Sequence, residues 1–143
     1  MDTPHTLLIV EDEILPAMSL QAGLSDAGYQ VMDLTSRPEE ALVAARARKP
    51  ELALVNIKLY GRNDGIALAV DLKALGVPVL FISGQPDRAL AARSVAVGSL
   101  AKPYSVDDMV AAVAYLLARL DGDATQPRPK DLQVFDEDLP EAV

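Results

Sequence analysis

The feature that most constrains the fold is a run of four apolar residues that ends in a single amide side chain. Residues 52–55 read Leu-Ala-Leu-Val, and Asn56 follows them. A short run of this kind, bounded by Pro50 and Gly61, is typical of a strand that is buried on both faces. Such strands belong to parallel sheets covered by helices on each side. Ligands of these sheets bind beyond the carboxyl ends of the strands, which is where Asn56 lies.

Four further segments have the pattern of strands, at residues 6–10, 30–34, 77–82 and 99–101. Amphipathic segments alternate with them and predict five helices: one that Gly28 ends, then roughly 36–48, 64–75, 87–97 and 106–120. Met18, Met32 and Met109 are expected to fill the core. The alternation favours right-handed crossovers and a three-layer, doubly wound α/β fold. We expect a parallel five-stranded sheet in the flavodoxin-like order 2-1-3-4-5.

The composition limits the kind of protein this can be. The 143 residues suit one domain, and a net charge of -8 argues against a nucleic-acid-binding surface. Cysteine is absent, so disulfides and thiolate metal sites are excluded. The first expected strand begins at Thr6, and no apolar run approaches the length of a membrane span, so we expect a cytoplasmic protein with no membrane association.

The expected domain covers residues 1–120, and a different kind of segment follows it. Residues 121–143 hold several prolines among many acids, which predicts a mostly disordered tail. Leu132, Val134 and Phe135 are the residues of this tail that could dock on the domain. The tail is too short for an output domain, so we expect the chain to act through protein–protein contacts.

Polar side chains follow four of the five expected strands. Since strands one, three, four and five are neighbours in the expected order, these side chains converge on one site. They are Glu11, Asp12, Asn56, Ser83 and Lys102. Carboxylate oxygens suit Mg²⁺, which bridges to phosphate oxygens, while a hydroxyl and an ammonium can hold the remaining phosphate oxygens. The residues therefore predict a site for Mg²⁺ and a phosphoryl group.

At this point the chain resembles the receiver domain of bacterial two-component response regulators. The resemblance extends over residues 5 to 120, and five short motifs occur in order on the expected elements. They are LIVEDE at 8–13, LALVNIKL at 52–59, DGI at 64–66, FISG at 81–84 and KPY at 102–104.

The resemblance implies a role for each site residue. Glu11 and Asp12 match the family's acidic pair, with Asp12 as the direct Mg²⁺ ligand, and the backbone carbonyl of Lys58 would be another ligand. Ser83 matches the switch hydroxyl, and Lys102 matches the lysine that binds the phosphoryl group. The family also implies a cis Lys102–Pro103 bond. Without a ligand, we expect Lys102 to form an ion pair with Asp12.

Asn56 departs from the family pattern, because it stands where the family carries its phospho-accepting aspartate. An acyl phosphate requires a carboxylate nucleophile, so the amide should block phosphoryl acceptance and weaken Mg²⁺ binding. Two interpretations stay open: a natural receiver that works without phosphorylation, or an engineered aspartate-to-asparagine change in a normal receiver.

A second departure lies on the fifth strand. The family carries an aromatic residue three positions before the lysine, where this chain has Ser99, and the stretch from Ser83 to Lys102 is a few residues short. Tyr104 is a candidate substitute, but we favour a packing role for it at the start of the last helix.

The resemblance predicts a signalling protein and not an enzyme. Its phosphoryl donor would be a sensor histidine kinase or a histidine phosphotransfer protein, and Mg²⁺ its cofactor. A downstream protein, or a second copy in a homodimer, would bind the face formed by the fourth helix, the fifth strand and the last helix. The alternative is a phosphorylation-independent interaction module.

Overall fold

The computed structural model describes residues 5–62 and 64–135 of the chain. Its strands are β1 (Thr6–Val10), β2 (Gln30–Val31), β3 (Leu52–Asn56), β4 (Val79–Ser83), β5 (Gly98–Ala101) and β6 (Leu132–Val134). Its helices are α1 (Ile14–Asp26), α2 (Pro38–Ala47), α3 (Asp64–Ala74), α4 (Pro86–Ala91) and α5 (Val106–Leu120), with a 3-10 turn at Arg93–Val95. None of the helices in these ranges is long and apolar enough to cross a membrane.

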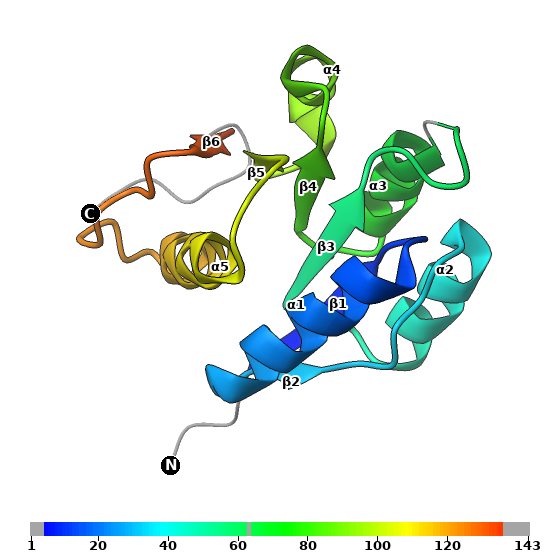
Figure 1. The fold of residues 1–143 in the computed structure, drawn as a ribbon, viewed down its shortest axis with the longest axis horizontal. Helices are drawn as coiled ribbons and strands as arrows, with labels where there is room; N and C mark the ends of the chain where they lie inside the picture. Colours follow the sequence, from blue (N-terminus) through cyan, green and yellow to red (C-terminus); the bar gives the residue numbers. More distant parts are fainter. Residues whose placement is uncertain (1–4, 63, 136–143) are drawn as a thin grey trace.

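The strands form one sheet in the order β2-β1-β3-β4-β5-β6 (Figure 1). The first five strands pair in parallel, which confirms the expected order 2-1-3-4-5. Beyond these five parallel strands, β6 adds a sixth strand, antiparallel to β5. It comes from the segment for which the sequence predicted a tail.

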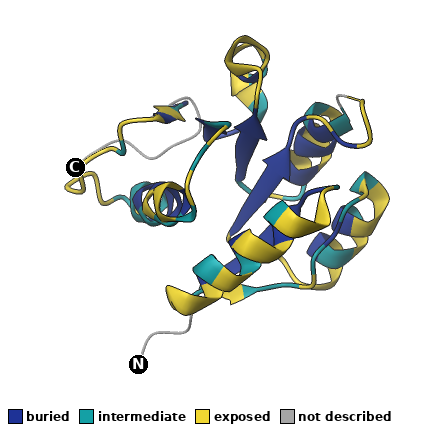
Figure 2. Ribbon diagram, viewed as in Figure 1, coloured by how far each residue is buried: buried dark blue, intermediate teal, exposed yellow. Residues whose placement is uncertain are grey.

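Every residue of β1, β3 and β4 is buried, as the continuous apolar runs predict. The dark blue arrows of β3 and β4 show this in Figure 2. Side chains alternate between the two faces of the sheet, so two cores form. The core under α1 and α5 includes Leu7, Ile9, Leu20, Leu54, Met109 and Leu116. The core under α2, α3 and α4 includes Leu8, Val55, Leu68, Phe81 and Ala89.

Helix α5 spans the residues that the sequence predicted. Its first turn is closed by a capping box, in which the Ser105 hydroxyl accepts from the Asp108 backbone N–H and the Asp108 carboxylate accepts from the Ser105 N–H, both at 3.0 Å. This pairing satisfies two donors that a helix start would leave without partners. The helix therefore begins at a fixed position, just after Lys102 and Pro103.

The fourth helix is shorter than the expected span 87–97, because it ends at Ala91 and a 3-10 turn follows. The backbone N–H of Val97 donates to the carbonyl of Val79 at 2.8 Å, so the chain must be back at the sheet by residue 97. Sheet pairing ends the Ala-rich helix early.

The core position expected for Met18 was also wrong. Met18 is 52% exposed on α1, together with Ile14 and Leu15, whereas Met109 is fully buried. The helix turns Ala17, Leu20 and Leu24 to the sheet instead.

The expected disorder of the tail does not hold for residues 132–135. Leu132 and Phe135 are 4% and 5% exposed, in line with the docking that the apolar residues allowed. The domain boundary at residue 120 stays a prediction, and residues 136–143 lie outside the described part of the chain.

Candidate functional site

The structure brings the predicted polar residues together at the carboxyl ends of β1, β3, β4 and β5. Asn56 pairs in register with Ile82 and Ser83 with Ala101, so these strand ends lie side by side. A cavity of about 220 Å³, here called the crevice, lies at this edge. It is lined by Asn56, Ile57, Lys58, Ser83, Gly84, Gln85 and Lys102.

Asn56 is 3% exposed and faces the acidic pair, Glu11 and Asp12. Its amide nitrogen Nδ2 donates to Glu11 Oε2 at 2.5 Å and lies 3.4 Å from Asp12 Oδ1. A carboxylate can only accept hydrogen bonds when it is ionised, so the amide presents its donor side to both acids. The side chain at position 56 therefore acts as a donor toward the residues expected to hold a cation.

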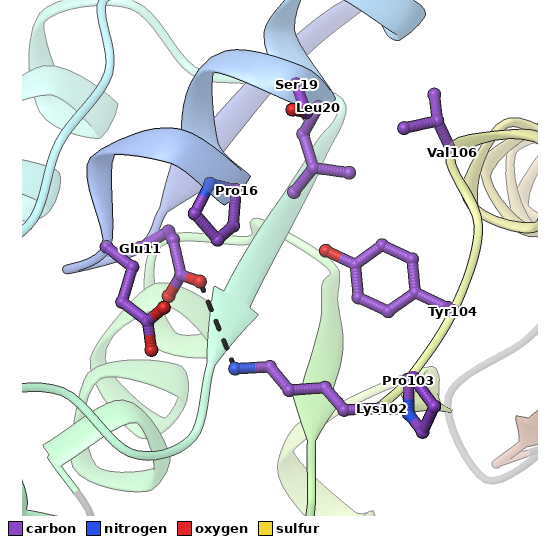
Figure 3. Close-up of a pocket in the computed structure, with 9 residues that line it drawn as sticks. Glu11, Pro16, Ser19, Leu20, Lys102, Pro103, Tyr104 and Val106 are labelled. Atoms are coloured by element: carbon purple, nitrogen blue, oxygen red, sulfur yellow. Dashed lines mark ion pairs between the residues drawn. The ribbon is translucent and has the colours of Figure 1, made fainter.

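Glu11 is 4% exposed, and burial raises the pKa of its carboxyl above the ordinary value of 4.5. The charge of Lys102 and the hydrogen bond from Asn56 lower the pKa of this carboxyl, and the charges of Asp12 and Glu13 add to the rise. Lys102 Nζ lies 3.9 Å from Glu11 Oε1 (Figure 3). The ion pair expected with Asp12 is thus formed with Glu11 instead.

Asp12 is turned toward the loop after β3. Its Oδ2 accepts from the backbone N–H of Tyr60 at 3.0 Å, and Tyr60 takes a positive φ of 52°. The Tyr60 hydroxyl donates to Ser36 Oγ at 3.0 Å, which ties this loop to the start of α2. The sequence did not indicate that Tyr60 would contact Asp12, because the contact uses a backbone N–H, which nearly every residue type has. This contact explains why Asp12 does not face Lys102.

Ser83 makes a turn contact and also lines the crevice. Its hydroxyl accepts from the Gln85 backbone N–H at 2.7 Å, which is turn chemistry just before α4. The side chain is 2% exposed and also lines the crevice. The backbone N–H of Lys102 donates to the Ser83 carbonyl at 2.8 Å, so the β4–β5 pairing holds the hydroxyl and the lysine side by side.

A larger cavity of about 670 Å³ opens beside the crevice, between α1 and the segment that leads into α5 (Figure 3). Glu11 and Lys102 line one end, and Tyr104 lies across it from Pro16 and Leu20. Burial, with a smaller contribution from the Glu11 charge, raises the pKa of Tyr104 to about 12. Tyr104 packs against the core under α1 and α5, which confirms its expected packing role. The bond before Pro103 is cis, as expected.

Ser99 is 2% exposed on β5, opposite Phe81 on β4 and Gln133 on β6. The position is therefore buried and holds no aromatic side chain.

The carboxylate oxygens of the acidic pair, which would be the ligands of Mg²⁺, accept hydrogen bonds in this arrangement. In residues 5–62 and 64–135, no three acidic, histidine or cysteine side chains gather around a point that could hold a metal ion. Mg²⁺ requires oxygen ligands, and two of the carboxylate oxygens here accept hydrogen bonds from Asn56. A third accepts from the Tyr60 backbone. Rotation of the amide would be needed before Asn56 could offer an oxygen.

Comparison with known proteins agrees with this geometry. The sequence pattern of the response regulator receiver domain matches residues 7–114. The transcriptional regulatory protein PdtaR of Mycobacterium tuberculosis is 30% identical over 120 residues, which is 81% of this chain and 58% of the relative. The phyllosphere-induced regulator PhyR of Methylorubrum extorquens is 33% identical over 119 residues, or 81% of this chain and 45% of the relative.

The chain thus spans about half the length of these curated relatives. Among solved structures, a protein assigned as a response regulator from Chloroflexus aurantiacus superposes with a TM-score of 0.73 and 31% identity. That match covers 82% of this chain and all of the other. The topology, the converging site residues and the family match lead to one conclusion: the chain belongs to the response regulator receiver domain family and is a signalling module of two-component systems, not a classical enzyme.

Proposed function

We propose that this chain is a receiver in which Asn56 blocks phosphoryl acceptance at the position that the family uses. The observation that carries the proposal is the hydrogen bond of 2.5 Å from Asn56 Nδ2 to Glu11 Oε2. A carboxamide has no anionic oxygen with which to attack phosphorus, and its nitrogen lone pair is delocalised. Position 56 therefore cannot form the acyl phosphate on which phosphorelay depends.

The amide also stabilises the charges of the acidic pair, which a bound metal ion would otherwise do. A cation would neutralise the carboxylates, and here the amide N–H and the Tyr60 N–H solvate them by hydrogen bonds. Magnesium binding should consequently be weak in this chain. With aspartate at position 56, the ligands would be Glu11, Asp12, residue 56 and the Lys58 carbonyl, and bound Mg²⁺ would neutralise phosphate charge.

The remaining site residues support phosphoryl binding once an acceptor is present. Ser83 and Lys102 line the crevice beside position 56, where a hydroxyl and an ammonium could hold phosphoryl oxygens. The donor would be a sensor histidine kinase or a histidine phosphotransfer protein. The cytoplasmic location that such donors imply stays a prediction.

The experiment compares this chain with the variant Asn56→Asp, both treated with acetyl phosphate and Mg²⁺ and measured by intact mass. We expect a phosphate adduct on Asn56→Asp alone, and its loss when Ser83→Ala and Lys102→Ala are added. An adduct on the unmodified chain would show that position 56 is not the acceptor.

A second candidate function is a phosphorylation-independent interaction module. The same hydrogen bonds favour it, because the Asn56 amide supplies hydrogen-bond partners to the acidic pair. The pair is therefore satisfied without a metal ion or a phosphoryl group. In that case Asn56→Asp would gain neither a phosphate adduct nor a change in melting temperature with Mg²⁺ or beryllofluoride. A response to either reagent would reject this candidate.

A further inference from the structure

The loop after β3 turns back in a tight hairpin that brings the backbone of Tyr60 to the site. Leu59 and Arg62 exchange two backbone hydrogen bonds, at 2.7 and 3.0 Å, and so close the turn. The residues between them both have a positive φ, 52° at Tyr60 and 77° at Gly61. Tight hairpins favour this conformation, but it is uncommon for a residue that has a side chain. The contacts of the Tyr60 side chain help to hold the turn in it.

The Tyr60 side chain makes two contacts with the segment that leads into α2. Its hydroxyl donates to Ser36 Oγ at 3.0 Å, and Arg37 Cζ lies over its ring, 5.3 Å from the ring centroid. A guanidinium over an aromatic face is attracted by the ring. These contacts attach the turn to the start of α2, although Tyr60 is 54% exposed.

The segment that Tyr60 contacts is itself fixed to β1. Thr35, which precedes Ser36, is buried, and its hydroxyl donates to the Ile9 carbonyl at 2.8 Å. The Glu11 backbone N–H donates to the Thr35 carbonyl at 3.1 Å. The acceptor of the Tyr60 hydroxyl is therefore held close to the end of β1, where the acidic pair lies.

Together these contacts orient the Asp12 carboxylate. Its Oδ2 accepts from the Tyr60 N–H at 3.0 Å, while its Oδ1 lies 3.4 Å from Asn56 Nδ2. The Tyr60 bond thus engages one oxygen and leaves the other directed at the side chain of position 56. Oε2 of Glu11 faces the same amide nitrogen. Mg²⁺ binds carboxylate oxygens of this kind, so the acidic pair fits the cation once the side chain at position 56 no longer donates to it.

We propose that Tyr60 is a positioning residue, which sets the affinity of the site for Mg²⁺ through the orientation of Asp12. The inference rests on the proposed function, in which Asp12 is a Mg²⁺ ligand when position 56 carries a carboxylate. A carboxylate that binds a metal ion is itself held by a hydrogen bond, and loss of that partner weakens metal binding by roughly 10- to 100-fold. Here the partner is a backbone N–H, so its position depends on the turn and on the side chain that holds the turn.

The test measures Mg²⁺ affinity by chemical-shift titration in Asn56→Asp and in the same variant with further substitutions. Tyr60→Gly removes the side chain but keeps the N–H and suits the positive φ, and it should weaken Mg²⁺ binding about 10-fold. Tyr60→Phe and Ser36→Ala each remove the same hydrogen bond and should each weaken binding about threefold. The two together should weaken binding no more than either alone.

Tyr29→Phe is the matched control. It removes a tyrosine hydroxyl next to β2, at the end of the sheet where β1 begins, and should leave Mg²⁺ affinity unchanged. A second measurement follows amide hydrogen exchange in the unmodified chain without metal. Asp12→Ala removes the acceptor of the Tyr60 N–H and Ser36→Ala loosens the turn, so both should speed exchange at Tyr60 but not in β3. A general loss of stability would speed both.

The outcomes separate this inference from the proposed function. Equal Mg²⁺ affinity with and without Tyr60→Gly would overturn the inference and leave the proposed function standing. No Mg²⁺ binding by Asn56→Asp would reject the proposed function and this inference with it. Exchange at Tyr60 that is unchanged by Asp12→Ala would also overturn the inference, because Asp12 would then not be the partner of the N–H.

Discussion

The identity of one buried side chain sets the electrostatic state of the site. Asn56 is uncharged, so the site combines the two carboxylates of the acidic pair with the ammonium of Lys102, which lies near Glu11. An aspartate there would add a third carboxylate within hydrogen-bond distance of the acidic pair. Like charges at this distance raise the free energy of the folded protein unless a cation neutralises them.

This predicts that two substitutions at position 56 both reduce stability but differ in their response to Mg²⁺. Asn56→Ala removes the donor from the buried Glu11 carboxylate and should reduce the free energy of unfolding by about 1 to 3 kcal/mol, with or without Mg²⁺. Asn56→Asp should also reduce stability without metal, but Mg²⁺ should restore it by binding the folded state. Urea denaturation with and without Mg²⁺ measures both. The exposed amide variant Gln126→Ala serves as the control, and equal Mg²⁺ responses of Asn56→Ala and Asn56→Asp would contradict the argument.

The buried Glu11 carboxyl makes a prediction about pH. Its pKa is raised in the folded state, so the folded protein binds a proton more readily than the unfolded chain does. The stabilising effect is complete below the ordinary value of 4.5 and is lost as the pH rises through the higher folded pKa. Glu11→Gln keeps an acceptor for Asn56 but removes the charge. We expect the variant to be more stable than the original chain at neutral pH, with a smaller difference as the pH falls.

Urea denaturation of both proteins between acidic and neutral pH measures this difference. Glu13→Gln, on an exposed residue in the same acidic run, is the matched control. A stability difference for Glu11→Gln that does not change with pH would show that Glu11 does not titrate differently on folding.

At the scale of elements, the loop after β3 and the start of α3 hold the site together. The Gly65 N–H donates to the Ile57 carbonyl at 2.9 Å, so α3 begins in contact with the end of β3. A Cβ atom on Gly65 would lie 2.7 Å from the Ile57 Cα and would also overlap the Asn56 carbonyl oxygen. Backbone atoms cannot rotate away as a flexible side chain can.

Gly65→Ala should therefore destabilise the domain by about 1 to 3 kcal/mol, the usual cost of overpacking a tight contact. Gly84→Ala is the control, because a Cβ atom there would meet nothing within 4 Å. Thermal unfolding of the two variants gives the comparison. Similar melting temperatures for both would mean that α3 can move away from β3 without cost.

At the scale of the whole molecule, the sheet should be most stable at its centre. Strands β1, β3 and β4 are fully buried and paired on both sides, whereas β2 and β6 are edge strands of two and three residues. Local opening requires less free energy where fewer apolar contacts are lost. We expect amide hydrogen exchange to be slowest in β1, β3 and β4, and faster in β2 and β6. Protection of β6 equal to that of β3 would show that β6 opens only with the whole domain.

Local patterns in the sequence were sufficient for the core of the fold. Continuous apolar runs predicted the central strands, and the 3-4 spacing of apolar residues predicted the span of α5, because both patterns report burial directly. Because adjacent parallel strands have their carboxyl ends at the same edge of the sheet, the expected strand order placed five polar residues together there: Glu11, Asp12, Asn56, Ser83 and Lys102. Their convergence follows from strand direction and needs no knowledge of side-chain contacts.

Only the tertiary structure decided the features that depend on contacts between distant segments. The strand β6 forms because Gly98 leaves room for another backbone, and nothing in residues 132–134 alone specifies that partner. Helix α4 ends early because Val97 must pair with β4. Lys102 lies near Glu11, not Asp12, because the Tyr60 N–H holds Asp12 elsewhere. Sequence patterns indicate which residues are buried. Which strand, hydrogen-bond or ion-pair partner each residue has depends on how the whole chain packs.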